Sequence, residues 1–438
     1  MNRLRKCSPV YKVAFYGAAF AAATAVSFVD VGNTRVKAAL EDSPKAILDE
    51  AWQIVNNEYV DPSFNKTNWK AVRQDLLSRN YTSREQAYKA LAAALEKLED
   101  PYTRFMDPKQ FEALTSQTSG ELSGIGIRLE QDNKTKSLLV VEPIDGSPAL
   151  KAGMRTGDEI VAIDNRMTYG MTVEEASELI RGEAGSKVQL RIRRDGKLFN
   201  VSITRARIEL PAVRYSVKQE GSQRYGYIRL NEFSAHAAEQ MRNAIRKLTA
   251  QNVNGFVLDL RGNPGGLLQS SIEISRMWMD RGAIVKTVDR KGKSIREFAN
   301  QTALTKLPLV VLVDNDSASS SEILTGALMD NKRATIVGTQ TFGKALVQSV
   351  HSLSDGSGLA VTIAHYYTPK GTDISKKGIT PDVKVGLTER DRDRLAADPK
   401  LIATQADPQY AKAISALDQL VIVKPSSTNK PQASNIEP

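Results

Sequence analysis

The first part of the chain has a helical pattern of hydrophobic and polar positions. Between residues 43 and 97, apolar residues recur at steps of three and four, which predicts a helix that ends near Asp61-Pro62. A second helix is predicted to begin at 82–85, where Thr82 and Ser83 precede Glu85 in a capping pattern, and to end at Asp100-Pro101. Residues 39–118 are therefore expected to form an N-terminal helical region, and this region shows no visible chemistry.

From residue 119 to residue 207 the pattern changes to short β-branched runs separated by glycines. The order is a strand, a second strand near 138–141, a short helix after 146–149, a turn and strand at 157–163, and a helix at 173–181. This order of elements resembles a PDZ domain. The first strand opens with the residues Gly124, Ile125, Gly126 and Ile127.

The resemblance to a PDZ domain implies a peptide-binding role. It implies that the amides of residues 125–127 capture the terminal carboxylate of a peptide, which then adds to the sheet as an extra strand. Glycine suits this loop, because it lets consecutive N–H groups converge on an anion. A PDZ fold used only as a spacer or as a regulatory clamp is the alternative.

Strands and helices alternate from about Ile208 onward, which is typical of an α/β fold. Beyond residue 400 a C-terminal helix and a mobile tail are expected, with little to bury after Leu420. The predicted elements are strands at 225–230, 255–260, 307–313 and 335–337, and helices at 235–248, 267–279 and 320–329.

Composition limits the classes of function. With 438 residues, 41% of them hydrophobic and 25% charged, the chain suits two to four globular domains. Residues 1–38 hold six basic residues and one acid, so half of the net charge of +10 lies there. No basic run interleaved with aromatics occurs elsewhere, which argues against nucleic-acid binding. One cysteine and three scattered histidines argue against a metal centre, and no cofactor is expected.

The N-terminus resembles a signal for export. Four basic residues precede a charge-free apolar run from Val13 to Val29, and small residues follow at Val36-Lys37-Ala38. This order predicts a signal peptide over residues 1–38 and leaves no stable membrane span after its removal. A retained anchor is the alternative, but the run is short for a spanning helix and rich in alanine.

Three segments could carry chemistry. The first, Asp314–Glu322, places Ser317, Ser319, Ser320 and Ser321 where a buried strand turns into a helix, so that a hydroxyl could meet the unpaired N–H groups of the helix. The same segment also fits a structural role, because Ser319 and Glu322 match a helix capping box.

The second segment is Thr341–Gln348. Lys344 lies among apolar neighbours, where desolvation lowers the pKa of an amine, and a neutral lysine can accept a serine proton. Gln348 follows four residues later, a spacing that places it on the same face as Lys344 in either a strand or a helix, where it could orient the amine. An ordinary surface lysine is the alternative.

The third segment is Asp259–Leu267, a predicted strand end followed by a glycine-rich loop and a helix. Such a loop can aim a backbone N–H at an oxyanion. It could also cradle phosphate, although it lacks the ending of a P-loop.

Together, in this order and behind a PDZ-like region, the three segments resemble the carboxy-terminal processing peptidases, also called tail-specific proteases. The resemblance implies a multidomain α/β fold with a ClpP/crotonase-like protease core over residues 208–400. It implies Ser319 as nucleophile, Lys344 as general base, Gln348 as its assistant, and amides of Gly265 and Ser320 as oxyanion donors. The sequence departs from the family pattern at Ala345, where glycine is usual, and at Ser320, where alanine is usual.

The stretches Glu58–Asp61 and Asp100–Phe105 look like the photosynthetic branch of this family, which matures the photosystem II reaction-centre precursor. The expected partners are proteins with free carboxyl termini, and the expected location is the thylakoid lumen or the periplasm. The alternatives are a general periplasmic tail-specific protease for quality control and a non-catalytic binding protein. A histidine-dependent esterase is disfavoured, since no G-x-S-x-G elbow is present.

Overall fold

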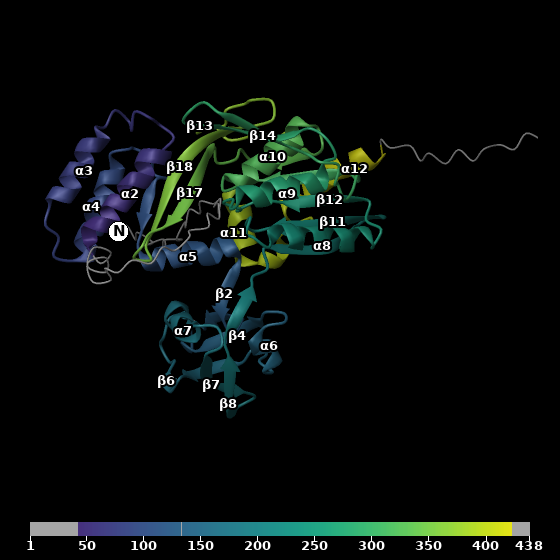
Figure 1. The fold of residues 1–438 in the computed structure, drawn as a ribbon. Coiled ribbons are helices and arrows are strands. Elements are labelled where there is room, and N and C mark those ends of the chain that lie inside the picture. Colours follow the sequence, from purple (N-terminus) through teal and green to yellow (C-terminus); the bar gives the residue numbers. More distant parts are fainter. Residues whose placement is uncertain (1–42, 133, 423–438) are drawn as a thin grey trace, which may run out of the picture. The chain divides into compact units, whose positions relative to one another are not determined.

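The computed structural model describes residues 43–132 and 134–422. The predicted signal peptide and residues 423–438 of the predicted tail lie outside the described residues. The described chain divides into two compact units (Figure 1). One is Thr115–Pro211, and the other contains the residues before and after it.

The larger unit is built on a six-stranded sheet. Its first two strands are antiparallel, and each later neighbour is parallel. The order is β10 (Val213–Glu220), β11 (Gln223–Leu230), β12 (Gly255–Asp259), β15 (Leu309–Val313), β16 (Thr335–Gly338) and β19 (Val383–Lys384).

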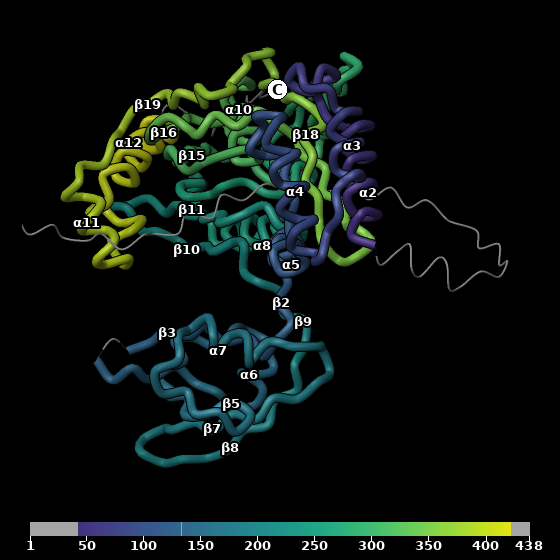
Figure 2. Tube along the Cα trace, turned by 90° about the vertical axis from the view of Figure 1, so that its left-hand side faces the viewer, coloured from purple at the N-terminus to yellow at the C-terminus, as the bar shows by residue number. Residues whose placement is uncertain are grey.

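Both faces of this sheet are covered, which explains why β12 and β15 read as continuous apolar runs. Phe256 and Leu258 pack with the helices α8 (Ala237–Thr249), α9 (Leu268–Trp278) and α10 (Ser320–Asp330). Val257, between them, packs with α12 (Pro408–Ile422) on the other face, and Figure 2 shows α12 beside β15 and β16. Since β12 and β15 are parallel neighbours, the loops that follow them lie at the same edge of the sheet.

A second sheet joins the N-terminal helices to the rest of the unit. A long hairpin of β17 (Leu346–Ser352) and β18 (Gly358–Tyr367) pairs with β1 (Arg104–Met106) and with β13 (Ala283–Asp289), which in turn pairs with β14 (Ser294–Phe298). The helices α2 (Pro44–Glu58), α3 (Trp69–Ser78) and α4 (Arg84–Glu96) share one hydrophobic core with hairpin residues such as Leu359 and Val361. The helical region and the hairpin are therefore one packed body.

The smaller unit contains the predicted strands and short helices in the predicted order. Its sheet runs β3 (Ile127–Gln131), β4 (Leu138–Pro143), β5 (Glu159–Ile163), β7 (Lys187–Arg194) and β8 (Lys197–Thr204), with β6 (Arg166–Met167) beside β5. The helices are α6 (Pro148–Lys151) and α7 (Val173–Ile180), and β2 (Glu121–Gly124) pairs with β9 (Ala206–Glu209). Helix α5 (Pro108–Ser119) begins in the larger unit and ends in the smaller one, and helix α11 (Glu389–Ala397) belongs to the larger unit.

Helix ends differ from the prediction by a few residues. The first helix ends at Glu58 and α4 ends at Glu96, earlier than the proline signals at 62 and 101 suggest. Helix α3 was not predicted, because it is only ten residues long and buries only three side chains, too few for a clear period. Its start is marked by Asn68, whose side chain accepts the N–H of Ala71.

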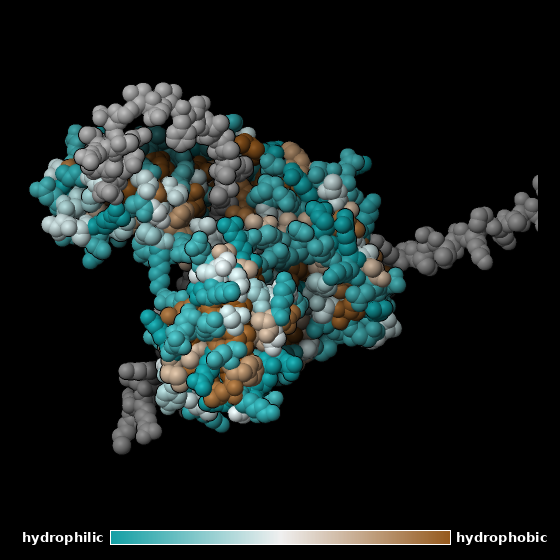
Figure 3. Space-filling model, turned by 60° about the horizontal axis from the view of Figure 1, so that its bottom comes forward, coloured by the Kyte–Doolittle hydropathy of each residue, from teal (hydrophilic) through white to brown (hydrophobic). Residues whose placement is uncertain are grey.

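Within the described ranges, no helix is both long and apolar enough to cross a bilayer. On the face drawn in Figure 3, hydrophobic side chains are scattered among hydrophilic ones. Exposed apolar side chains in the smaller unit include Met167 and Tyr169. Single exposed apolar side chains are common on folded proteins and identify no binding surface by themselves.

Candidate active site

Ser319 occupies a sharp turn between β15 and α10. Its backbone has φ +54° and ψ −114°, a conformation that a residue with a side chain rarely adopts. Such conformations cost about 1–3 kcal/mol and persist where the surroundings enforce them. Ser319 is 4% exposed and immediately precedes the first turn of α10. The strained turn therefore fixes this serine at the helix N-terminus, at the edge where the glycine loop also lies.

Lys344 lies in the loop between β16 and β17 and is 2% exposed. Its Nζ lies over the ring of Tyr102, 4.7 Å from the ring centre. Burial holds the pKa of Lys344 well below the ordinary lysine value. The carboxylates of Asp100 and Glu322 act against this shift, and Arg104 adds to it, but burial is the largest cause. The environment therefore favours the neutral amine.

Glu322 ties the backbones of Ser319 and Lys344 together. One oxygen, Oε2, accepts the N–H of Ser319 and the N–H of Lys344, each at 3.0 Å, so the two amide nitrogens lie no more than about 6 Å apart. The other oxygen accepts the N–H of Gly343 at 2.7 Å and the hydroxyl of Thr341 at 2.6 Å. Burial raises the pKa of Glu322 in spite of these bonds. Glu322 thus forms its half of the predicted cap and also joins two segments that are distant in sequence.

Tyr366 on β18 ties the same two residues from their carbonyl side. Its buried hydroxyl lies 3.1 Å from the carbonyl oxygen of Ser319 and also within hydrogen-bonding distance of that of Lys344. Amides and carbonyls of both residues are thus held by shared partners. Neither Tyr366 nor the link from Glu322 to Lys344 was found from the sequence.

Gln348 is fully buried on β17. Its Nε2 donates to Thr362 Oγ1 at 3.4 Å, and its Oε1 has no hydrogen-bond partner among the described residues. Lys344 precedes β17, and the pairing with β18 shifts register between Val347 and Gln348, so strand alternation does not fix which way this side chain faces. Its assignment as the assistant of Lys344 stays a prediction.

The glycine loop packs directly against the serine turn. Gly265 has φ +104°, and a Cβ built there would lie 2.8 Å from the Ala318 carbonyl oxygen and 2.9 Å from the Ser319 Cβ, so only glycine fits. The N–H of Gly265, one predicted oxyanion donor, donates to Asn263 Oδ1 at 2.9 Å and is engaged within the loop. Ser320, the other predicted donor, is the first residue of α10, where an N–H has no carbonyl one turn earlier in the helix.

The other hydroxyls of the serine segment bond to backbone carbonyls. Ser317 Oγ donates to Leu260 O and Ser321 Oγ donates to Asn263 O, both at 2.9 Å. Ser320 Oγ donates to Gly266 O, also at 2.9 Å. These bonds attach the segment to the glycine loop and occupy three of the four candidate hydroxyls in structural roles.

In the smaller unit, residues 122–129 line a cavity of about 180 Å³ together with Ile144 and with Ser177, Ile180 and Arg181 at the end of α7. Gly126 has φ +79°, and a Cβ there would lie 2.4 Å from Ser147 Cβ. The carbonyls of Ile125 and Gly126 accept the N–H groups of Ala149 and Ile144, which fixes this loop. The four predicted peptide-binding residues therefore line one groove between β3 and α7.

The sequence shows no visible chemistry in the N-terminal region, but the structure brings part of this region against Lys344. The turn at Asp100–Arg104 places the ring of Tyr102 beside Lys344 and supplies two charges that act on its amine. Asp100 shapes this turn by accepting the N–H of Tyr102 and the hydroxyl of Thr103. In the sequence this stretch shows only its resemblance to the photosynthetic branch, because nothing in its spacing points to a lysine about 240 residues later.

Comparison with known proteins decides the family. Residues 224–385 match the model of peptidase family S41, and residues 139–194 match a PDZ domain. A carboxyl-terminal-processing protease of Picosynechococcus sp. is 42% identical over 378 residues, covering 85% of this chain and 89% of that protein. The chain belongs to the carboxyl-terminal-processing proteases of peptidase family S41.

Two further proteins are similar to this chain. The chloroplastic carboxyl-terminal-processing peptidase 2 of Arabidopsis thaliana is 41% identical, covering 76% of this chain and 67% of that protein. A solved structure titled photosystem II D1 C-terminal processing protease is 37% identical, covering 78% of this chain and 93% of that one, with a TM-score of 0.49.

The resemblance to carboxy-terminal processing peptidases is confirmed, as is the predicted multidomain α/β fold with a PDZ domain and a protease core. The chain is thus a peptidase that acts on protein substrates.

Proposed function

We propose that this S41 protease is an endopeptidase with a serine nucleophile and a lysine base, Ser319 and Lys344, which cuts near the carboxyl terminus of its substrates. The observation that carries the proposal is the shared Glu322 oxygen, which accepts the N–H groups of both residues. It joins the backbone of a strained serine to that of a lysine whose pKa is lowered by burial, which favours the neutral amine.

The proton transfers follow from these environments. The neutral amine of Lys344 accepts the proton of Ser319 Oγ as the oxygen attacks the scissile carbonyl carbon. The resulting ammonium then gives that proton to the leaving amine, and a water molecule repeats the sequence to release the acyl group. Gln348 Oε1, buried without a partner among the described residues, would accept an N–H of the lysine and hold it toward Ser319.

The charge that develops on the carbonyl oxygen needs donors at the loop edge. The N–H of Ser320 is suited to this role by its place at the start of α10. The N–H of Gly265 would have to exchange Asn263 Oδ1 for the oxyanion when substrate binds. In this proposal, the hydrogen bond between the Gly265 N–H and Asn263 Oδ1 breaks when substrate binds.

Substrate selection would rest on the smaller unit. The amides of Ile125, Gly126 and Ile127 would bind a free terminal carboxylate in the groove that Gly124 also lines. The peptide would extend along β3. This role gives the protease its preference for carboxyl-terminal tails.

We further propose export to a thylakoid lumen or periplasm, with removal of about residues 1–38, and maturation of the photosystem II reaction-centre precursor. Support comes from the basic and apolar order of the N-terminus and from the cyanobacterial and chloroplast relatives. N-terminal sequencing of the mature protein tests the export, since an intact Met1 would contradict it. Incubation with the precursor's carboxyl-terminal tail tests the substrate.

The nucleophile is tested by replacing each candidate serine. Ser319→Ala should abolish cleavage of a peptide substrate with the fold intact, because its backbone contacts to Glu322 and Tyr366 do not use the hydroxyl. Ser317→Ala and Ser321→Ala should keep substantial activity and lose about 1 kcal/mol of stability each, since their hydroxyls bond to carbonyls. Wild-type turnover by Ser319→Ala would mean that the serine serves only the helix start.

A further inference from the structure

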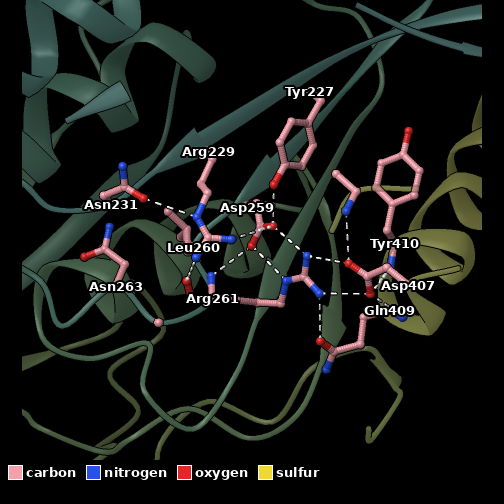
Figure 4. Close-up of polar contacts among 12 residues, drawn as sticks. Tyr227, Arg229, Asn231, Asp259, Leu260, Arg261, Asn263, Asp407, Gln409 and Tyr410 are labelled. Atoms are coloured by element: carbon pink, nitrogen blue, oxygen red, sulfur yellow. Dashed lines mark hydrogen bonds and ion pairs between the residues drawn. The ribbon is translucent and has the colours of Figure 1, made fainter. Parts of the chain in front are cut away.

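A buried ionic cluster lies directly before the glycine loop (Figure 4). Arg261, two residues after Asp259 at the end of β12, donates to both oxygens of that carboxylate at 2.9 and 2.7 Å. On its other side the guanidinium donates to both oxygens of Asp407 at 3.1 and 2.9 Å, and to Gln409 Oε1 at 3.0 Å. Asp407 and Gln409 come from the C-terminal segment, about 146 residues away in sequence.

The cluster is buried and balanced in charge. Asp259 and Asp407 are fully buried, and Arg261 is 8% exposed. Burial disfavours the charge of Arg261, but the two carboxylates outweigh it and raise its pKa. Arg229, whose side chain is 30% exposed and 3.5 Å from Asp259, supplies the second positive charge. Removal of one buried carboxylate therefore leaves a buried cation without its full set of acceptors.

The hydrogen bonds of the cluster continue into the glycine loop. The carbonyl of Arg261 accepts from Arg229 at 3.2 Å, and the N–H of the next residue, Gly262, donates to Asp314 at 2.9 Å. Asn263 then donates to Leu230 O through its side chain and accepts the N–H of Gly265. Arg261 is thus the first fixed residue of a loop in which Gly265 packs against Ser319 and the carbonyl of Gly266 accepts the hydroxyl of Ser320.

The C-terminal segment has its own anchors besides this contact. Asp407 stands before α12 and accepts the N–H groups of Gln409 and Tyr410. Gln409 Nε2 donates to Val385 O, and Asp418 accepts the hydroxyl of Tyr225. Apolar residues of α12 also pack on the sheet. The hydrogen bonds that Arg261 donates to Asp407 and Gln409 can therefore be removed while α12 stays attached to the sheet.

We infer that Asp407 and Gln409 are positioning residues, which hold Arg261 so that the glycine loop keeps its place against the serine turn. The inference rests on the proposed function of that turn. It makes the C-terminal segment part of the machinery for hydrolysis, although none of its residues belongs to the loop or to the serine segment. Misplacement of reacting groups by 1 Å can cost about 100-fold in rate, so a modest movement of this loop is enough to be measured.

The decisive variant is Asp407→Asn. Asparagine is as good as aspartate before a helix, so α12 keeps its start, whereas Arg261 loses a charged bidentate acceptor. The kcat for a tail peptide should fall about 10- to 100-fold, while KM stays within about 3-fold because the terminal carboxylate binds elsewhere. Asp418→Asn is the matched control on the same helix, without contact to Arg261, and should keep wild-type kcat.

A second variant covers the case in which Asp407→Asn does not fold, as judged by its melting temperature. Gln409→Met removes one acceptor from Arg261 and leaves Asp407 in place, and its kcat should fall several-fold at unchanged KM. Ser319→Ala, measured in parallel, separates the two proposals. If Ser319→Ala is inactive but both C-terminal variants keep wild-type kcat, the positioning role is refuted. If Ser319→Ala is active, the proposed function itself fails.

Discussion

Replacing Lys344 by methionine should remove activity and, near neutral pH, make the protein more stable. Lys344 is 2% exposed, and burial keeps the pKa of its amine well below the ordinary value of about 10.4. In the unfolded chain the same amine is protonated below about pH 10.4. Because the unfolded state binds a proton that the folded state does not bind, Lys344 lowers the free energy of unfolding at neutral pH. Methionine has a similar length and no charge, which removes this cost without leaving a large cavity.

The sign and the slope follow from proton linkage. Between the lowered pKa of folded Lys344 and about pH 10.4, the unfolded state binds one more proton, so the wild-type free energy of unfolding rises with pH by up to about 1.4 kcal/mol per unit. The methionine variant lacks this rise. The difference in free energy of unfolding between the variant and the wild type should therefore decrease as pH rises from the folded pKa of Lys344 to about 10.4. Below that folded pKa and above about pH 10.4, the difference should no longer change with pH.

Urea unfolding of the wild type and the variant at several pH values between 6 and about 10 measures this difference directly. Lys247→Met, an exposed position on α8, is the control, and its difference from the wild type should stay flat. A flat difference for Lys344→Met over the same range would show that the folded lysine stays charged, held by Asp100 and Glu322, and would refute the neutral-base reasoning.

Three further outcomes are expected. Asp100→Asn should move the rise of kcat/KM to lower pH, because it removes a negative charge that raises the pKa of Lys344. Arg104→Gln should move that rise to higher pH, because it removes a positive charge that lowers the same pKa. If both variants shift the pH–rate profile in the same direction, this reasoning is contradicted. Amidation of a substrate's terminus should raise KM while kcat holds, and equal values of kcat/KM for acid and amide would exclude carboxylate binding by the Gly124–Ile127 loop. Gly265→Ala should abolish activity, since its Cβ would strike the Ala318 carbonyl, and a wild-type rate would show that the loop can yield.

Features encoded in local sequence were predictable. The parallel strands β11, β12, β15 and β16, the PDZ elements and the serine, lysine and glycine segments are each visible as a run or motif of fewer than about twenty residues. The order of these segments was enough to name the family, because the order of segments is itself carried by the sequence.

What depends on contacts across the chain was not predictable. The sequence predicts Glu322 as part of a helix cap, whereas its bonds to Gly343 and Lys344 depend on a loop more than twenty residues away. Tyr366 and Asp407 have no motif at all, since a single buried polar residue gives no periodic signal. The engagement of the Gly265 amide by Asn263 likewise depends on side-chain geometry inside one loop.

Glu322 and Tyr366 hold the backbone of the proposed nucleophile and base, not their reacting atoms. Because these hydrogen bonds do not use the side chains of Ser319 and Lys344, either of those two side chains can be replaced while the backbone keeps its course. An inactivated copy such as Ser319→Ala should consequently still engage a tail as the intact enzyme does, without releasing it by cleavage. Such a copy is the natural bait for recovering the protein's own substrates and for observing a bound tail in place.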